Sequence, residues 1–150
     1  MTTPSGYSAL SATPRPGDVR LEILRRHYES EIVAAAARVR RTVRVAPYVL
    51  AGPGAERQAD LKLIEEYVSG KGWHVTRSSF ADLGQAPPIT ERSGFGEASL
   101  YAAQGFAHGI VAIARTAITT DNETYARVLD HLYLRGVFLA YLPAEDGTPA

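Results

Sequence analysis

The stretch ERSGFGEASLYAAQGFAHGIVAIARTAITTDNETYARVLDHLYLRGVFLAYL, residues 91–142, decides the fold of this 150-residue chain. It contains a short helical segment at 97–104 and a continuous apolar run at 109–114, which is typical of a strand covered on both faces. Residues 121–135 predict a longer helix, and residues 137–142 predict a closing strand. Apolar residues recur at helical spacing in the longer helix: Tyr125, Val128, Leu129 and Leu132.

The preceding residues continue the same alternation. Residues 42–51 are rich in β-branched and aromatic residues and predict a strand, and residues 55–70 predict a helix that ends in Gly-Lys-Gly. Residues 73–80 alternate as a second strand, and the Pro- and Gly-containing residues 81–92 predict a long exposed loop. We therefore expect an α/β fold with a mostly parallel four-stranded sheet and helices on both faces.

One domain accounts for most of the chain, because 150 residues with 45% hydrophobic and 21% charged residues match an ordinary globular domain. Residues 1–17, rich in Ser, Thr, Pro and Gly, predict a disordered tail, and residues 144–150 predict another. An extra N-terminal helix is expected over 18–41, with Asp18 as its N-cap. The α/β domain then spans 42–143.

Composition narrows the function classes. The formal net charge is zero, so any attraction to nucleic acid must come from a local patch. Cysteine is absent, no apolar run approaches the roughly 20 residues of a membrane span, and the N-terminus lacks a secretory-signal pattern. We expect a cytoplasmic protein with no membrane partner. The four histidines lack metal-ligand spacing, so no metal and no cofactor are expected.

Positive charge is concentrated near the N-terminus. Residues 15–44 hold eight arginines against four acidic residues, a net charge of +4. This stretch fits either a basic arm that faces phosphates or the solvated face of an amphipathic helix with cations near its C-terminal end. The candidate nucleic-acid-binding residues are Arg38, Arg40, Arg41 and Arg44.

Two stretches resemble the catalytic domain of the serine recombinases, the resolvase/invertase family. IEEYVSGKGWHVTRSSFADLG, residues 64–84, resembles the family's first helix, its second strand and the start of a flexible loop. Residues 91–142 resemble the family's order of Arg-containing turn, helix, strand, catalytic loop, helix and strand. The resemblance implies a resolvase-like fold. In the family a dimerisation helix and a DNA-binding domain follow the last strand, where this sequence reads PAEDGTPA, residues 143–150.

The resemblance carries over few of the family's catalytic side chains. The turn arginine corresponds to Arg92, whereas the catalytic-loop Asp and its two essential arginines fall on Thr116, Ala117 and Thr120. Arg115 lies beside the loop motif at a position that is usually Leu. Arg44, Arg92 and Arg115 are therefore candidates for a vestigial or anion-binding site.

The family's nucleophilic serine lies just after the first strand in a Tyr-x-Arg-x-Ser pattern, and two registers are available for it. The preferred register puts Ala46 at the serine and keeps Arg44 as the motif arginine, and the other puts Tyr48, Leu50 and Gly52 at the three positions. Neither register supplies a hydroxyl at the serine position. Since the phosphoserine link needs a nucleophilic oxygen, we expect no catalytic residues and no strand exchange.

Three functional hypotheses follow. The first is a non-catalytic, recombinase-like binding or regulatory module that forms a homodimer or binds a protein partner, with the N-terminal helix in place of the dimerisation helix. The second is a DNA-associated accessory protein that makes weak, non-specific DNA contacts through its basic stretch. The third is a domain for a small phosphorylated ligand in a crevice whose polar residues also fit a helix cap: Thr116, Thr119, Thr120, Asp121 and Asn122.

Overall fold

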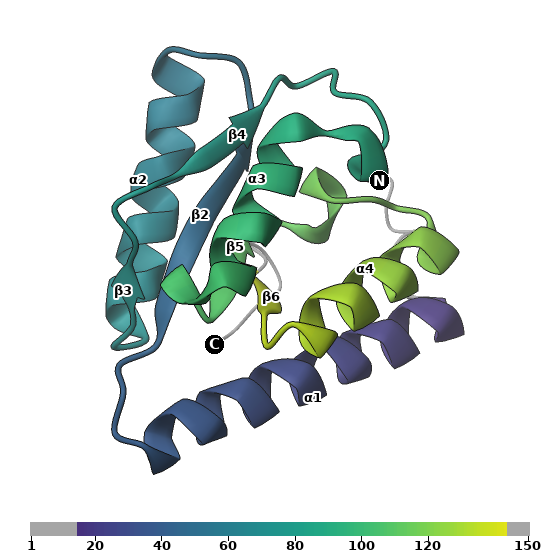
Figure 1. Ribbon diagram of the computed structural model, residues 1–150. Helices are drawn as coiled ribbons and strands as arrows, with labels where there is room; N and C mark the ends of the chain where they lie inside the picture. The colour runs from purple at the N-terminus through teal and green to yellow at the C-terminus, as the bar shows by residue number, and fades with distance from the viewer. Residues whose placement is uncertain (1–14, 144–150) are drawn as a thin grey trace, which may run out of the picture.

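The computed structural model describes residues 15–143, so the two predicted tails lie outside the described residues except for residues 15–17. Its elements in chain order are α1 (Pro16–Arg38), β2 (Arg44–Leu50), α2 (Ala55–Gly70), β3 (His74–Val75), β4 (Phe80–Asp82), η2 (Ile89–Glu91), α3 (Ser93–Tyr101), η3 (Ala102–Phe106), β5 (Gly109–Ala112), η4 (Arg115–Ala117), α4 (Asn122–Leu134) and β6 (Phe138–Tyr141) (Figure 1).

All pairs in the five-stranded sheet are parallel, in the order β3-β2-β5-β6, and β4 also pairs with β2. This confirms the predicted α/β fold, with one correction. The strand expected over 73–80 is two short strands, with β3 beside the first half of β2 and β4 beside its second half. A local bond from the Thr76 hydroxyl to the Ser78 carbonyl, 2.8 Å long, turns the chain between them. The predicted loop 81–92 therefore begins inside a strand.

Pro47 in the middle of β2 fits this interruption. Odd-numbered residues of β2 point their backbone groups toward β3 and β4, as seen where the Thr76 amide donates to the Val45 carbonyl and the Ala51 amide donates to the Asp82 carbonyl. The missing amide of Pro47 consequently faces the gap between β3 and β4. A proline, which removes a ladder donor, is tolerated there because the neighbouring strand is broken at that level.

Helices cover both faces of the sheet (Figure 1). On one face α2 packs Ile64 and Val68, both fully buried, against the strands. On the opposite face α3 and α4 bury Phe95 and Leu129. Each face of the sheet thus has its own apolar core, which confirms the expected arrangement. The carboxyl ends of the strands lie at one edge of the molecule.

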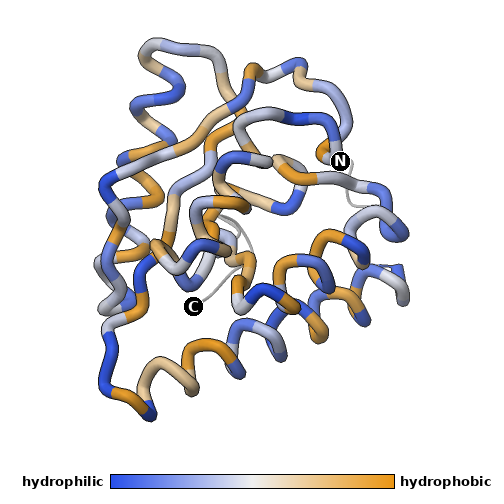
Figure 2. Tube along the Cα trace, viewed as in Figure 1, coloured by the Kyte–Doolittle hydropathy of each residue, from blue (hydrophilic) through white to orange (hydrophobic). Residues whose placement is uncertain are grey.

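The extra N-terminal helix, α1, lies along α4 and the outer edge of β6 (Figure 1). The Tyr28 ring stacks on Tyr133 with centroids 4.0 Å apart, and Arg25, only 7% exposed, donates to the Leu139 carbonyl at 2.7 Å. Figure 2 shows apolar and polar residues alternating along α1 and α4. The helix expected as a dimerisation element thus packs Leu21, Leu24 and Tyr28 on its own domain and leaves Val19 and Ile23 exposed.

The ends of α1 differ from the prediction. The helix begins at Pro16 with Arg15 as N-cap, and Asp18 lies inside the first turn, where it pairs with the Arg15 guanidinium at 3.2 Å. Proline at the first helical position needs no hydrogen-bonded amide, so the helix starts earlier than Asp18. It ends at Arg38 because Arg40 adopts a left-handed conformation, φ 58°.

Candidate functional site

The carboxyl edge of the sheet is where open α/β sheets bind ligands, because the loops that follow the strands converge there. In this protein the converging loops follow β2, β4 and β5. They bring together Tyr48 and Asp82 with Arg92 and the first turn of α3. This edge is also where the recombinase resemblance puts its catalytic groups.

Asp82 is the centre of this edge. Its Oδ1 accepts the Gly94 amide at 2.9 Å, and its Oδ2 accepts both the Phe95 amide at 3.0 Å and the Tyr48 hydroxyl at 2.9 Å. The carboxylate therefore caps the N-terminus of α3 from a different strand. This cap explains why α3 begins at Ser93 rather than at the predicted residue 97.

Gly94 allows this close approach. A Cβ at this position would lie 2.1 Å from the Ala81 carbonyl oxygen, so only glycine lets α3 sit against β4. The amide of Gly94 then points straight at Asp82. Sequence reasoning missed Asp82 because its partners lie twelve and thirteen residues further along the chain. The available signal was an acidic residue directly after the apolar pair Phe80-Ala81.

Arg92, the turn arginine of the resemblance, is tied into the same edge. Its Nε donates to the Pro87 carbonyl at 2.7 Å, and its Nη1 donates to the Ala117 carbonyl at 2.7 Å and lies 3.4 Å from the Tyr48 hydroxyl. Burial, reinforced by Asp82 and opposed by Arg92, raises the pKa of Tyr48 to about 12. Tyr48 is therefore a neutral hydroxyl at physiological pH, and Arg92 joins two loops.

The structure distinguishes the two registers for the family's serine. Ala46 lies inside β2 and is fully buried, so it does not stand just after the strand. Gly52 follows the end of β2 and is partly exposed ahead of α2. The preferred register, with Ala46 and Arg44, therefore does not match a serine position just after the first strand. The register with Tyr48, Leu50 and Gly52 fits the strand, and it too supplies no hydroxyl at the nucleophile position.

The predicted crevice is a pocket of about 350 Å³ beside this edge. Arg92 forms one wall, and the residues it shares the pocket with include Thr116, Thr119, Thr120 and Asp121. Asp121 accepts the Thr124 amide at 2.8 Å and so serves as the N-cap of α4, as one of the two interpretations expected. The fifth crevice candidate, Asn122, does not line this pocket.

Arg115 faces away from the crevice. Its Nη2 donates to Asn122 Oδ1 at 2.6 Å, its guanidinium carbon lies 4.0 Å from the Tyr125 ring centroid, and its Nη1 lies 3.6 Å from Asp18 on α1. These contacts fasten the loop after β5 to α1 and α4. Arg92 and Arg115 therefore do not share a pocket, and Arg44 lies at the opposite edge of the sheet. The three candidate arginines do not converge on one anion site.

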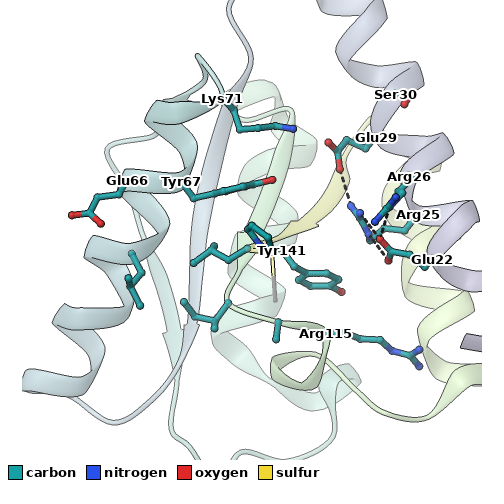
Figure 3. A pocket seen from close by; sticks show the side chains of 15 residues that line it. Glu22, Arg25, Arg26, Glu29, Ser30, Glu66, Tyr67, Lys71, Arg115 and Tyr141 are labelled. Carbon is teal, nitrogen blue, oxygen red and sulfur yellow. Dashed lines mark hydrogen bonds and ion pairs between the residues drawn. The ribbon is translucent and has the colours of Figure 1, made fainter. Parts of the chain in front are cut away.

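A second cavity, about 1240 Å³, lies between α1, α2 and the end of β6 (Figure 3). Its charged side chains are largely paired, since Arg25 bonds Glu22 at 2.8 Å and Glu29 at 2.7 Å. The Tyr141 hydroxyl in its wall lies 2.8 Å from that of Tyr125. The cavity thus reflects how α1 is fastened beside the sheet, with Arg25 as its central contact.

The candidate nucleic-acid residues gather at the amino edge of β2. Arg38 ends α1, Arg40 and Arg41 follow it and are exposed, and Arg44 begins β2 with its Nη2 3.3 Å from the Gly105 carbonyl. The Arg44 amide donates to His108 Nδ1 at 3.0 Å. Burial, together with the charges of Arg41 and Arg44, lowers the pKa of His108. This basic cluster lies at the end of β2 away from Asp82.

Between residues 15 and 143 no helix combines the length and apolarity that a bilayer crossing requires. Within the same range, no three His, Asp or Glu side chains lie close enough together to hold a metal ion.

Comparison with solved structures finds the recombinase architecture. The fold is similar to the crystal structure of the C-terminal catalytic domain of ISC1926 TnpA, an IS607-like serine recombinase, with a TM-score of 0.56 and 12% sequence identity. The similarity covers 69% of this chain and 72% of that one. No family model matches the chain, and no curated protein matches it in sequence. At this identity the likeness establishes a recombinase-like fold.

Proposed function

We propose that the protein is a serine-recombinase-like domain that does not catalyse strand exchange and acts by binding a protein, either a second copy or a different partner. The observation that carries the proposal is the composition of the carboxyl edge. The register that fits β2 puts Gly52, two residues past its end, at the serine position, and Asp82, Tyr48 and Arg92 bond to one another and to backbone groups. These side chains are occupied in holding the fold together.

Strand exchange needs a nucleophilic oxygen and cations around a doubly charged transition state. Glycine offers no oxygen, and the loop positions that carry Asp and Arg in the family are Thr116, Ala117 and Thr120 here. Loss of one transition-state arginine of this kind costs about 10³-fold or more in rate. With two arginines and the serine replaced, the remaining activity is negligible.

The proposal is tested with supercoiled plasmid DNA, the full chain and Mg²⁺. We expect the wild-type protein and the Gly52→Ser variant to leave the plasmid supercoiled on a gel, because a restored hydroxyl still lacks the cations. Nicked, linear or recombined plasmid with the wild-type protein would overturn the proposal. Cleavage by the Gly52→Ser variant but not by the wild-type protein would contradict the claim that the missing arginines prevent strand exchange.

Sedimentation velocity over a range of protein concentrations tests whether the protein binds a second copy of itself or a different protein. A concentration-dependent dimer supports self-association. A monomer at all concentrations supports a different protein as the partner.

A second candidate function, non-specific DNA contact, is supported by the grouping of Arg38, Arg40, Arg41 and Arg44 at the amino edge. In residues 15–143 none of the four is joined to an acidic side chain by an ion pair. A non-glycine residue in the left-handed conformation of Arg40 costs about 1 kcal/mol. That conformation closes α1, because the Arg40 amide donates to the Ala37 carbonyl at 3.0 Å and the Arg41 amide donates to the Ala36 carbonyl at 2.9 Å.

The salt dependence of duplex binding tests this candidate. Four phosphate contacts predict that log K falls with log salt with a slope of about −3.6. The double variant Arg38→Gln, Arg41→Gln reduces the slope by about 1.8, while Arg77→Gln, at an exposed position between β3 and β4, leaves it unchanged. Affinity that is independent of salt would exclude this function.

A further inference from the structure

A groove of about 570 Å³ runs between α3 and α4, on the face of the sheet opposite α2. Its floor is apolar and buried, formed by Ile89, Phe95 and Leu132. Leu100 stands on its rim with 61% of its surface exposed, and half-buried Val128 lies on the α4 side. The groove adjoins the crevice beside the recombinase-like edge, because Ile89, Thr90 and Thr124 line both.

The charge along this groove has one sign. Arg127, His131 and Arg135 line it at steps of four residues, which puts them on one side of α4. The other polar side chains in the lining, Thr90, Ser99 and Thr124, are neutral, and no carboxylate lines the groove. Arg127 is 73% exposed and pairs with Glu123 at 2.9 Å, an exposed pair that a carboxylate of the occupant can replace at little cost. An occupant of the groove therefore gains from negative charge along one side.

The groove also favours one backbone conformation for its occupant. Its walls are two helices, whose backbone groups are bonded within each helix, and no open strand edge lines it. An extended peptide would bring amide and carbonyl groups that find no partner there. An α-helix satisfies its own backbone and inserts only side chains, as in helix-in-groove recognition.

We propose that this groove binds an acidic amphipathic helix of a partner protein. Two apolar side chains one turn apart enter the floor beside Leu100, and carboxylates on the flank face Arg127 and Arg135. This inference rests on the proposed function and names the class of partner that the domain recognises.

A second copy of this chain fits the groove less well, as the exposed apolar side chains of its outer helices indicate. On α1, Val19 and Ile23 are exposed one turn apart, but the exposed charges beside them include Arg20 and Arg26, which would repel the basic wall. On α2, Leu63 is the one large apolar residue exposed among the described residues. The acidic residues beside this pair on α1, Asp18 and Glu22, are already bonded to arginines of the same helix or its N-cap, and α2 lacks a second apolar anchor.

The test is a selection from a displayed library of helix-forming peptides of about 16 residues, roughly four turns, with apolar and charged positions randomised. The full chain is the bait. A parallel selection uses Leu100→Asp, which puts a carboxylate on the apolar rim, and Leu134→Asp serves as the matched control because Leu134 is 81% exposed on α4 and does not line the groove. Fluorescence anisotropy then measures the affinity of the enriched peptide.

We expect the wild-type chain and Leu134→Asp to enrich acidic peptides with apolar residues three or four apart, and Leu100→Asp to bind them at least about tenfold more weakly. The double variant Arg127→Glu, Arg135→Glu should prefer the same peptide with its Glu residues changed to Lys. Enrichment of basic or extended peptides, or equal enrichment on Leu100→Asp, would overturn the proposal, as would a dimer of the wild-type chain that Leu100→Asp converts to monomer.

Failure of the groove proposal and failure of the non-catalytic proposal give different results. DNA cleavage by the wild-type chain would refute the non-catalytic proposal whether or not peptides bind. A failed selection without DNA cleavage would refute the groove and leave the non-catalytic proposal standing.

Discussion

Replacement of Asp82 by Ala removes one carboxylate that serves three donors, and the expected loss of stability follows from those contacts. Without the cap, the Gly94 and Phe95 amides at the start of α3 lose their acceptor, which costs about 1–2 kcal/mol. The buried Tyr48 hydroxyl loses its acceptor as well, at a further cost of about 1–3 kcal/mol. Together the variant should lose about 2–5 kcal/mol of unfolding free energy.

The assay is equilibrium unfolding in urea followed by circular dichroism. Asp121→Ala is the matched control, because Asp121 is an exposed helix cap with one bond to the Thr124 amide, and its loss should cost about 1 kcal/mol. Tyr48→Phe completes a double-mutant cycle with Asp82→Ala, and the coupling should be at least about 0.5 kcal/mol. If Asp82→Ala lowers the unfolding free energy no more than Asp121→Ala does, Asp82 does not organise the carboxyl edge.

Three further perturbations test other parts of the fold. Arg25→Met leaves two glutamates and a carbonyl of β6 without their donor and should lower the unfolding free energy by about 3 kcal/mol in urea. Arg26→Met, at a 73% exposed position, should lower it by under about 0.5 kcal/mol. Equal losses would contradict the buried role of Arg25. Gly94→Ala forces a methyl group against a backbone carbonyl of β4 and should lower stability by about 2 kcal/mol or more, whereas a neutral effect would show that α3 lies further from β4. The pKa of His108 is lowered from 6.5, so as the pH falls the unfolded chain binds a proton before the folded state does. The contribution of His108 to the unfolding free energy is therefore fully present above about pH 6.5 and is lost as the pH falls below it. In an NMR titration Arg41→Gln should raise the pKa of His108, and an unchanged value would contradict the role of that charge.

The sequence predicted those parts of the fold that depend on local pattern. The apolar run at 109–114 and the helical spacing over 121–135 correspond to β5 and α4, and the alternative of Asp121 as a helix cap is confirmed. The sequence did not predict β4 as a separate strand, because three residues are too few to show alternation. Its strand conformation depends on pairing with the second half of β2.

The candidate site was less predictable, because its contacts join residues far apart in sequence. Arg92 was identified through the resemblance, but its carbonyl partner on Ala117 is a tertiary contact. Arg44 and Arg115 were grouped with it by residue type, and the sheet separates them because one lies at the amino end of a strand and the other turns toward α1. The strand was expected to end before Ala46 in the preferred register, and it continues to Leu50 because a run of small and apolar residues does not reveal where a strand ends.

The central claim, that this recombinase-like domain has no nucleophile for DNA, is tested most directly by intact-protein mass spectrometry. The full chain is incubated with random-sequence duplex DNA that carries nicks to trap a phospho-linked intermediate, and the protein is then measured under denaturing conditions. The account predicts the mass of the unmodified chain and nothing heavier. A species heavier by a covalently attached strand, mapped to any Ser or Thr, would contradict it.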